Sequence, residues 1–148
     1  MTRLPVRVPQ TTALLAWLGS QLTGPVGDGK APTEPHGWQG APGQSSFIGY
    51  FVLHTITGGA LDGDLVRPSD DGDLIWQVNA IGGTAQQADL LADQAFEVLC
   101  DELPPLAING RAVLFADVDV PHGAAREDPD QPSIWMSVAR YRIATTPT

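Results

Sequence analysis

The chain has very little cysteine and no long apolar run. Cys100 is the single cysteine among 148 residues, which excludes an internal disulfide framework and is typical of a reducing compartment. No stretch is apolar enough to cross a membrane, and the first residues do not form a secretory signal. We therefore expect a soluble protein, made in the cytoplasm and without a membrane partner.

Basic residues are also scarce. Eight Lys and Arg stand against seventeen Asp and Glu, which gives a net charge of −9, and Lys30 is the only lysine. Sequence-independent binding of nucleic acid depends on Lys and Arg that neutralise phosphates. The composition therefore argues against tight DNA binding. An acidic surface lining a channel through which DNA passes without binding is compatible with this charge.

Glycine and proline are abundant, with 16 and 13 residues, and their clusters predict turns and irregular structure. The length predicts a single domain over 1–148 that can bury a core without a metal or disulfide. Within it we expect an N-terminal arm over 1–9 and long loops over 24–46, 57–73 and 121–132. Loops of this length in a compact domain are usually functional or disordered.

Two helices and four strands are indicated by the spacing of apolar residues. Leucines at helical spacing precede Gly24-Pro25, which ends the first helix. Thr84 and Gln87 have the form of a capping box at the start of the second helix, which Pro104-Pro105 ends. Alternating apolar, aromatic and β-branched residues predict strands over Phe47–Ile56, Leu74–Ile81, Ala112–Val120 and Ser133–Thr145.

The element order is therefore α-β-β-α-β-β. It predicts an α+β fold in which two helices pack on one face of a mainly antiparallel four-stranded sheet. The strands beginning at Phe47 and Ser133 are apolar on both sides. We therefore expect the other sheet face to be partly polar and to be covered by something, for example a neighbouring subunit.

The double glycine Gly82-Gly83 lies between a predicted strand and a predicted helix. A helix N-terminus attracts anions, but no nucleotide-binding glycine spacing is present and no lysine follows. We interpret the pair as a tight corner, where glycine supplies positive φ or close packing.

Two groups of acidic residues are candidates for a metal site. The Asp-rich segment 62–73 lacks the calcium-binding loop pattern, so solvated turn residues explain it better. Asp117, Asp119 and His122 would suit a small metal-dependent hydrolase only if further ligands converged. His36 and His54 are isolated, and no serine or cysteine has a nucleophile signature. We expect no catalytic residue, metal ligand or cofactor; a small-ligand binding module is a further alternative.

The pattern resembles the tail terminator proteins of long-tailed (siphovirus-type) bacteriophages, particularly those of actinobacteria. The resemblance covers roughly Leu14 to Ile143 and rests on LLAWLGSQL, the loop after it, FIGYFVLHTI and SIWMSVARYRI. The part from Trp76 to Leu99 carries most of it, because WQVNAIGGTAQQADLLAD resembles the strand, glycine-containing turn and helix of the family.

The resemblance implies a structural protein of the virion and not an enzyme. Such proteins form a hexameric ring at the head-proximal end of the tail, stop polymerisation of the tail tube and provide the surface on which the head–tail connector docks. The implied partners are further copies of the chain, the major tail tube protein and the connector, while DNA passes through the ring without specific binding. Another head–tail connector or completion subunit is the alternative within this class.

Ring closure through head-to-tail contacts needs two different complementary patches on each subunit. Aromatic and arginine side chains dominate the energetics of such contacts, and acidic residues offer them charge partners. The residues expected at subunit or partner interfaces are Trp38, Arg67, Asp70, Asp71, Asp73, Arg126, Trp135, Arg140 and Arg142.

Overall fold

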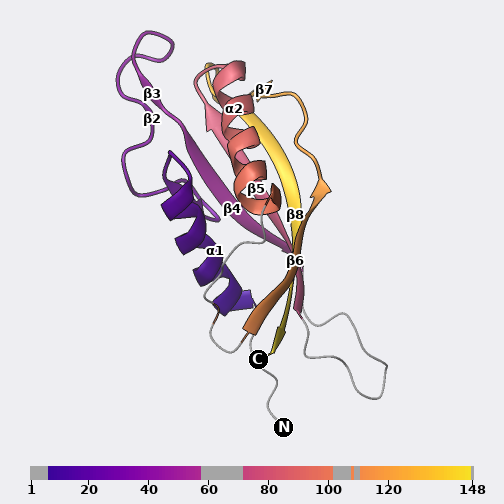
Figure 1. Ribbon diagram of the computed structural model, residues 1–148. Coiled ribbons are helices and arrows are strands. Elements are labelled where there is room, and N and C mark those ends of the chain that lie inside the picture. Colours follow the sequence, from indigo (N-terminus) through magenta and orange to yellow (C-terminus); the bar gives the residue numbers. More distant parts are fainter. Residues whose placement is uncertain (1–6, 58–71, 102–107, 109–110, 148) are drawn as a thin grey trace.

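The computed structural model describes residues 7–57, 72–101, 108 and 111–147. They form an α+β fold with two helices and a curled mixed sheet (Figure 1). The elements are α1 (Arg7–Gln21), β1 (Val26–Asp28), β2 (Gly37–Trp38), β3 (Phe47–Ile48), β4 (Tyr50–Thr57), β5 (Gly72–Gly82), α2 (Ala85–Phe96), the π-helical turn η1 (Glu97–Asp101), β6 (Arg111–Val120), β7 (Arg126–Glu127) and β8 (Trp135–Pro147).

The main sheet has six strands. Its order is β1-β4-β5-β8-β6, and β7 pairs with another stretch of β8. Strands β5 and β8 form its centre, in continuous antiparallel register from Gly72 opposite Thr145 to Gly82 opposite Trp135. β1 is parallel to β4, whereas the other pairs in this sheet are antiparallel. β2 and β3 form a separate two-stranded antiparallel sheet.

The expectation of a mainly antiparallel four-stranded sheet in the order α-β-β-α-β-β is therefore wrong. The four long strands β4, β5, β6 and β8 lie where strands were predicted, but the sheet also contains β1 and β7 and is mixed. β1 has three residues and β7 has two, too few to form an alternating pattern. β1 exists because distant partners hold it: Val26 lies opposite Phe51, and the Phe51 amide donates to the Pro25 carbonyl.

Several predicted boundaries also differ. α1 begins at Arg7, inside the predicted arm 1–9. The predicted loop 24–46 contains β1 and β2, and the predicted loop 121–132 contains β7. Of the predicted loop 57–73, Thr57 ends β4 and Gly72 begins β5; positions 58–71 lie outside the described residues.

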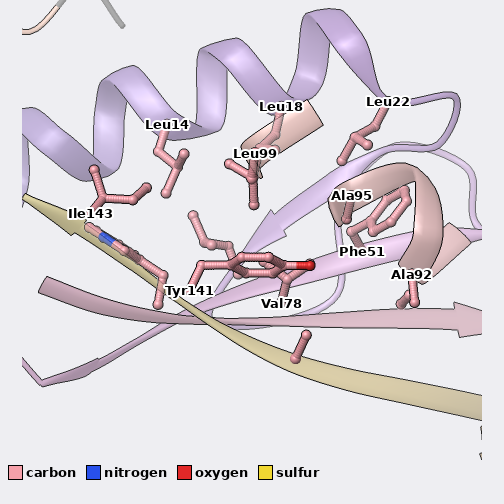
Figure 2. Close-up of a cluster of buried hydrophobic side chains, with 14 of the residues drawn as sticks. Leu14, Leu18, Leu22, Phe51, Val78, Ala92, Ala95, Leu99, Tyr141 and Ile143 are labelled. Carbon is pink, nitrogen blue, oxygen red and sulfur yellow. The ribbon is translucent and has the colours of Figure 1, made fainter. Parts of the chain in front are cut away.

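The main core lies between the two helices and one face of the sheet (Figure 2). Leu14 and Leu18 of α1 are fully buried. Ile143 of β8 is also fully buried, and Tyr141 of β8 is almost fully buried. Ala92, Ala95 and Leu99 face the same cluster from α2 and η1. Both helices therefore cover the same face of the sheet, which leaves the opposite face to be accounted for.

The corner at Gly82-Gly83 is a close-packing site. A Cβ on Gly83 would lie 2.8 Å from the Cβ of Phe47, and neither glycine is among the described residues with positive φ. Thr84 caps α2 by accepting a hydrogen bond from the Gln87 amide, and the Gln87 side chain accepts one from the Gly83 amide at 2.8 Å. The predicted cap by Thr84 is confirmed, whereas the reciprocal bond from the Gln87 side chain goes to Gly83, one residue before the cap. Steric closeness explains the glycines.

A second, smaller apolar cluster covers one end of the opposite sheet face. Tyr50 and Ile81 are buried there with Val52, and Phe47 and Met136 pack against them. The Tyr50 ring is stacked on Phe47, with centroids 6.2 Å apart. Burial, and then the nearby Asp128 carboxylate, raise the pKa of the Tyr50 hydroxyl.

Candidate functional site

Beyond this second cluster, the sheet face opposite the helices presents a mixture of polar, apolar and basic side chains. Arg140 and Arg142 are exposed, and the remaining members are half-buried. These positions alternate along each strand with residues of the main core, so they point to the other side of the sheet. We call this surface the open sheet face; it comprises His54, Ile75, Gln77, Asn79, Val138, Arg140 and Arg142.

Polar contacts hold the middle of the open sheet face. His54, Gln77 and Arg140 lie opposite one another on β4, β5 and β8. The Arg140 Nε donates to Gln77 Oε1 at 3.3 Å, and Gln77 Nε2 donates to Asn79 Oδ1 at 2.9 Å. These bonds order the side chains, while the Arg140 side chain stays exposed.

Two of the few basic residues of this acidic protein lie on the open sheet face. Arg140 and Arg142 are two of the eight basic residues in a chain of net charge −9. Asp117 of β6 lies opposite Arg142, while Ile75 and Val138 supply apolar area between polar groups. Apolar area combined with arginine is typical of the central part of a protein–protein interface.

A hollow of about 390 Å³ adjoins the open sheet face. It lies where the partner of β8 changes from β6 to β7, so the intervening segment does not close against the strand. Its lining is mainly apolar, with one arginine, and Val138 belongs to both surfaces. The lining residues are Val120, Pro121, Gly123, Ala124, Arg126, Met136 and Val138.

The outward side of α2 is a second exposed surface, on the helix-bearing side of the sheet (Figure 1). Leu90 is 60% exposed. Asp93 and Glu97 are exposed and follow Leu90 at positions i+3 and i+7, so the three side chains share one stripe. We call Leu90, Asp93 and Glu97 the α2 stripe.

The structure places the two predicted tryptophans at one end of the molecule. Both are half-buried. The Trp38 indole N–H donates to the Ser133 carbonyl at 3.2 Å, and its ring packs edge-on against Phe47. Trp135 lies opposite Gly82 in the sheet. Trp38 is thus engaged within its own chain.

The predicted charged residues do not all lie together. Arg140 and Arg142 share the open sheet face, and Arg126 lines the adjoining hollow. Asp73 lies in β5 opposite Ala144, while Arg67, Asp70 and Asp71 lie outside the described residues. Sequence reasoning missed the hollow and Leu90. The sequence did contain one indication that Leu90 is exposed: it is apolar but lies outside the buried stripe of α2.

A serine, a histidine and an aspartate do approach one another between α2 and the segment after β6. His122 Nε2 lies 2.7 Å from Asp93 Oδ1, and His122 Nδ1 lies 3.4 Å from Ser137 Oγ. Ser137 is 1% exposed and its hydroxyl donates to the Gly123 carbonyl. It also points to the opposite side of β8 from Met136 and Val138, which line the hollow. A hydroxyl buried in this way is not accessible to a substrate. The contacts among Ser137, His122 and Asp93 instead hold the segment after β6 against α2.

The same contacts bear on the predicted metal site. His122 turns toward Asp93 of α2, whereas Asp117 and Asp119 are exposed on β6. Within the described ranges, no group of three or more His, Cys, Asp or Glu side chains is arranged to hold a metal ion. Nor does any described helix combine the length and apolarity needed to cross a membrane.

No protein-family model matches the chain, and a search of curated proteins finds no match.

Proposed function

We propose that this chain is a structural subunit of a bacteriophage virion, the tail terminator of a long-tailed phage. In this role it forms a ring, expected to be a hexamer, at the head-proximal end of the tail. The ring ends polymerisation of the tail tube and provides the surface that receives the head–tail connector. The proposal starts from the sequence resemblance, which is carried mostly by Trp76 to Leu99.

One structural observation supports it most strongly. The helices cover one side of the sheet, while much of the other side is an amphipathic surface with two exposed arginines, Arg140 and Arg142. Apolar sheet area beside ordered polar groups is typical of surfaces that mark a protein interaction. A subunit whose function is assembly has a use for such a face, and no bond-making group is needed on it.

The charge of the chain supports the same role. A net charge of −9 with one lysine suits a ring through which DNA passes without adhering, because DNA binding depends on phosphate neutralisation. We therefore propose the major tail tube protein and the head–tail connector as its axial partners, and DNA as a passenger.

The test is tube assembly in vitro. Purified tail tube subunit is polymerised with and without an equimolar amount of this chain, and tube lengths and ends are imaged by negative stain. We expect shorter tubes that carry a ring at one end. R140E/R142E should lose this activity, whereas K30E, which reverses an exposed charge away from the open sheet face, should retain it.

The opposite result would be tubes of unchanged length with bare ends at every ratio of the two proteins. Binding of the chain to the connector alone, with no effect on tubes, would instead identify a neighbouring head–tail ring subunit. Either outcome would contradict the terminator assignment.

A further inference from the structure

We propose that copies of this chain join head to tail, with the α2 stripe of one copy seated on the hollow and open sheet face of the next. Leu90 is the anchor and enters the hollow beside Val138. This inference rests on the proposed function, because the contact is the one that would join neighbouring subunits of the proposed ring. The contact itself is argued from the two surfaces alone.

The first argument is size and polarity. Leu90 projects an apolar side chain that is 60% exposed, and the hollow of about 390 Å³ is lined mainly by apolar groups. A cavity of about 150 Å³ is enough to hold a benzene molecule. The hollow therefore has room for a leucine side chain, and burial of an exposed anchor in a pocket is typical of interface hot spots.

The second argument is charge. The anchor Leu90 is followed on its stripe by the exposed acids Asp93 and Glu97, whereas the hollow is followed along β8 by Arg140 and Arg142. Asp93 already contacts His122 through one oxygen, yet 64% of its side chain is exposed. Complementary charge of this kind sets the register and partner of an interface.

The third argument is spacing. Asp93 and Glu97 are four residues apart on a helix, which is about 6 Å along its axis. Arg140 and Arg142 are two residues apart on a strand, which is about 7 Å. Both surfaces also have the same order, an apolar position followed by two charges. The α2 stripe can therefore lie along β8 of the next copy with Leu90 at the Val138 end.

The two surfaces are different patches of one domain. α2 packs on the sheet face that is turned away from Arg140 and Arg142, and its Asp93 contacts His122, whose neighbours Pro121 and Gly123 line the hollow. A contact between two different patches is heterologous, because each copy offers one patch to one neighbour and the other patch to the next. Repetition of such a contact gives a closed ring when the rotation per copy closes.

The experiment uses two variants of the full chain. L90R/E97R damages the α2 stripe, and R140E/R142E damages the open sheet face. A16R places the same positive charge on an exposed position of α1, and K30E reverses an exposed charge elsewhere, so they serve as matched controls. Self-association is followed by sedimentation velocity with and without tail tubes, and the melting temperature checks that each variant folds.

We expect each interface variant alone to associate at least about tenfold more weakly than wild type, and both controls to behave as wild type. The decisive sample is the mixture. In this sample the second variant is R140A/R142A, because glutamates at 140 and 142 would attract the arginines introduced into the damaged stripe. An L90R/E97R copy retains its open sheet face and an R140A/R142A copy retains its α2 stripe, so the mixture should form one-to-one pairs that grow no further.

The outcomes separate this inference from the proposed function. If wild type shortens tubes but both interface variants assemble normally, or if their mixture stays monomeric, the contact is wrong and the terminator assignment stands. If the mixture pairs but wild type leaves tubes unchanged, the contact stands and the terminator assignment fails. A wild type that stays monomeric with or without tubes overturns the contact.

Discussion

Truncation to alanine should affect different properties at two leucines of this chain: the stability of the fold at Leu18 and the assembly of copies at Leu90. Leu18 of α1 is fully buried in the cluster that contains Phe51 and Leu99 (Figure 2), whereas Leu90 of α2 is 60% exposed. Leu18→Ala removes three carbons, a transfer loss of about 2.4 kcal/mol at about 0.8 kcal/mol each. The cavity left between helix and sheet raises the expected cost to about 3–4 kcal/mol.

For a domain of this length, that loss lowers the melting temperature by roughly 10 °C. Leu90→Ala should change the free energy of unfolding by no more than about 0.5 kcal/mol, as exposed substitutions usually do. Its effect should fall on assembly, because Leu90 is the proposed anchor. Thermal unfolding followed by circular dichroism, and sedimentation velocity on the same samples, measure the two responses.

The reasoning is refuted if Leu90→Ala destabilises the fold as much as Leu18→Ala does. That result would mean that Leu90 is buried within its own chain and is not available to a neighbour. A Leu90→Ala protein that folds and assembles like wild type would remove it as an anchor.

Three further predictions concern the fold. Gly83→Ala should lower the free energy of unfolding by about 1–3 kcal/mol, because the added Cβ would lie 2.8 Å from Phe47. Gly123→Ala should leave it unchanged, because open space surrounds that position. Urea unfolding compares the two variants, and equal effects would count against the close-packed corner. Thr84→Ala should lose about 1 kcal/mol through the missing cap of α2, and Thr84→Ser should keep most of it; equal stabilities of the two variants would contradict the capping role. Burial, and then the nearby Cys100 and Asp93 charges, raise the pKa of Tyr141 in the folded protein. The contribution of Tyr141 to the free energy of unfolding is therefore complete below the pKa of tyrosine in the unfolded chain, about 10, and is lost as the pH rises above it. Stability should fall above that pH in wild type and fall less in Tyr141→Phe, and identical alkaline profiles would contradict this.

Features that depend on neighbours in the sequence could be predicted. The Thr84–Gln87 cap lies within four residues, and leucines at helical spacing predicted α1. Alternation along β5 separates Trp76 and Val78, which are buried, from Gln77. The same alternation places Arg140 and Arg142 on one face, so part of the candidate surface follows from the strand pattern alone.

Features that depend on distant partners could not be predicted. β1 is held by pairing with β4 from Val26 opposite Phe51, across a Gly- and Pro-rich stretch with no periodicity. The hollow depends on β8 changing its partner from β6 to β7, and no local pattern contains that change. The packing of Trp38 against Phe47 and the Ser133 carbonyl likewise joins segments far apart in the chain.

The measurement that tests the central claim most directly is imaging of tail tubes assembled with this chain, combined with the mass of the complex at each tube end. The account predicts a closed ring of several copies, expected to be six, at one end of every shortened tube. Tubes of normal length with bare ends, or single copies scattered along the tube wall, would contradict it.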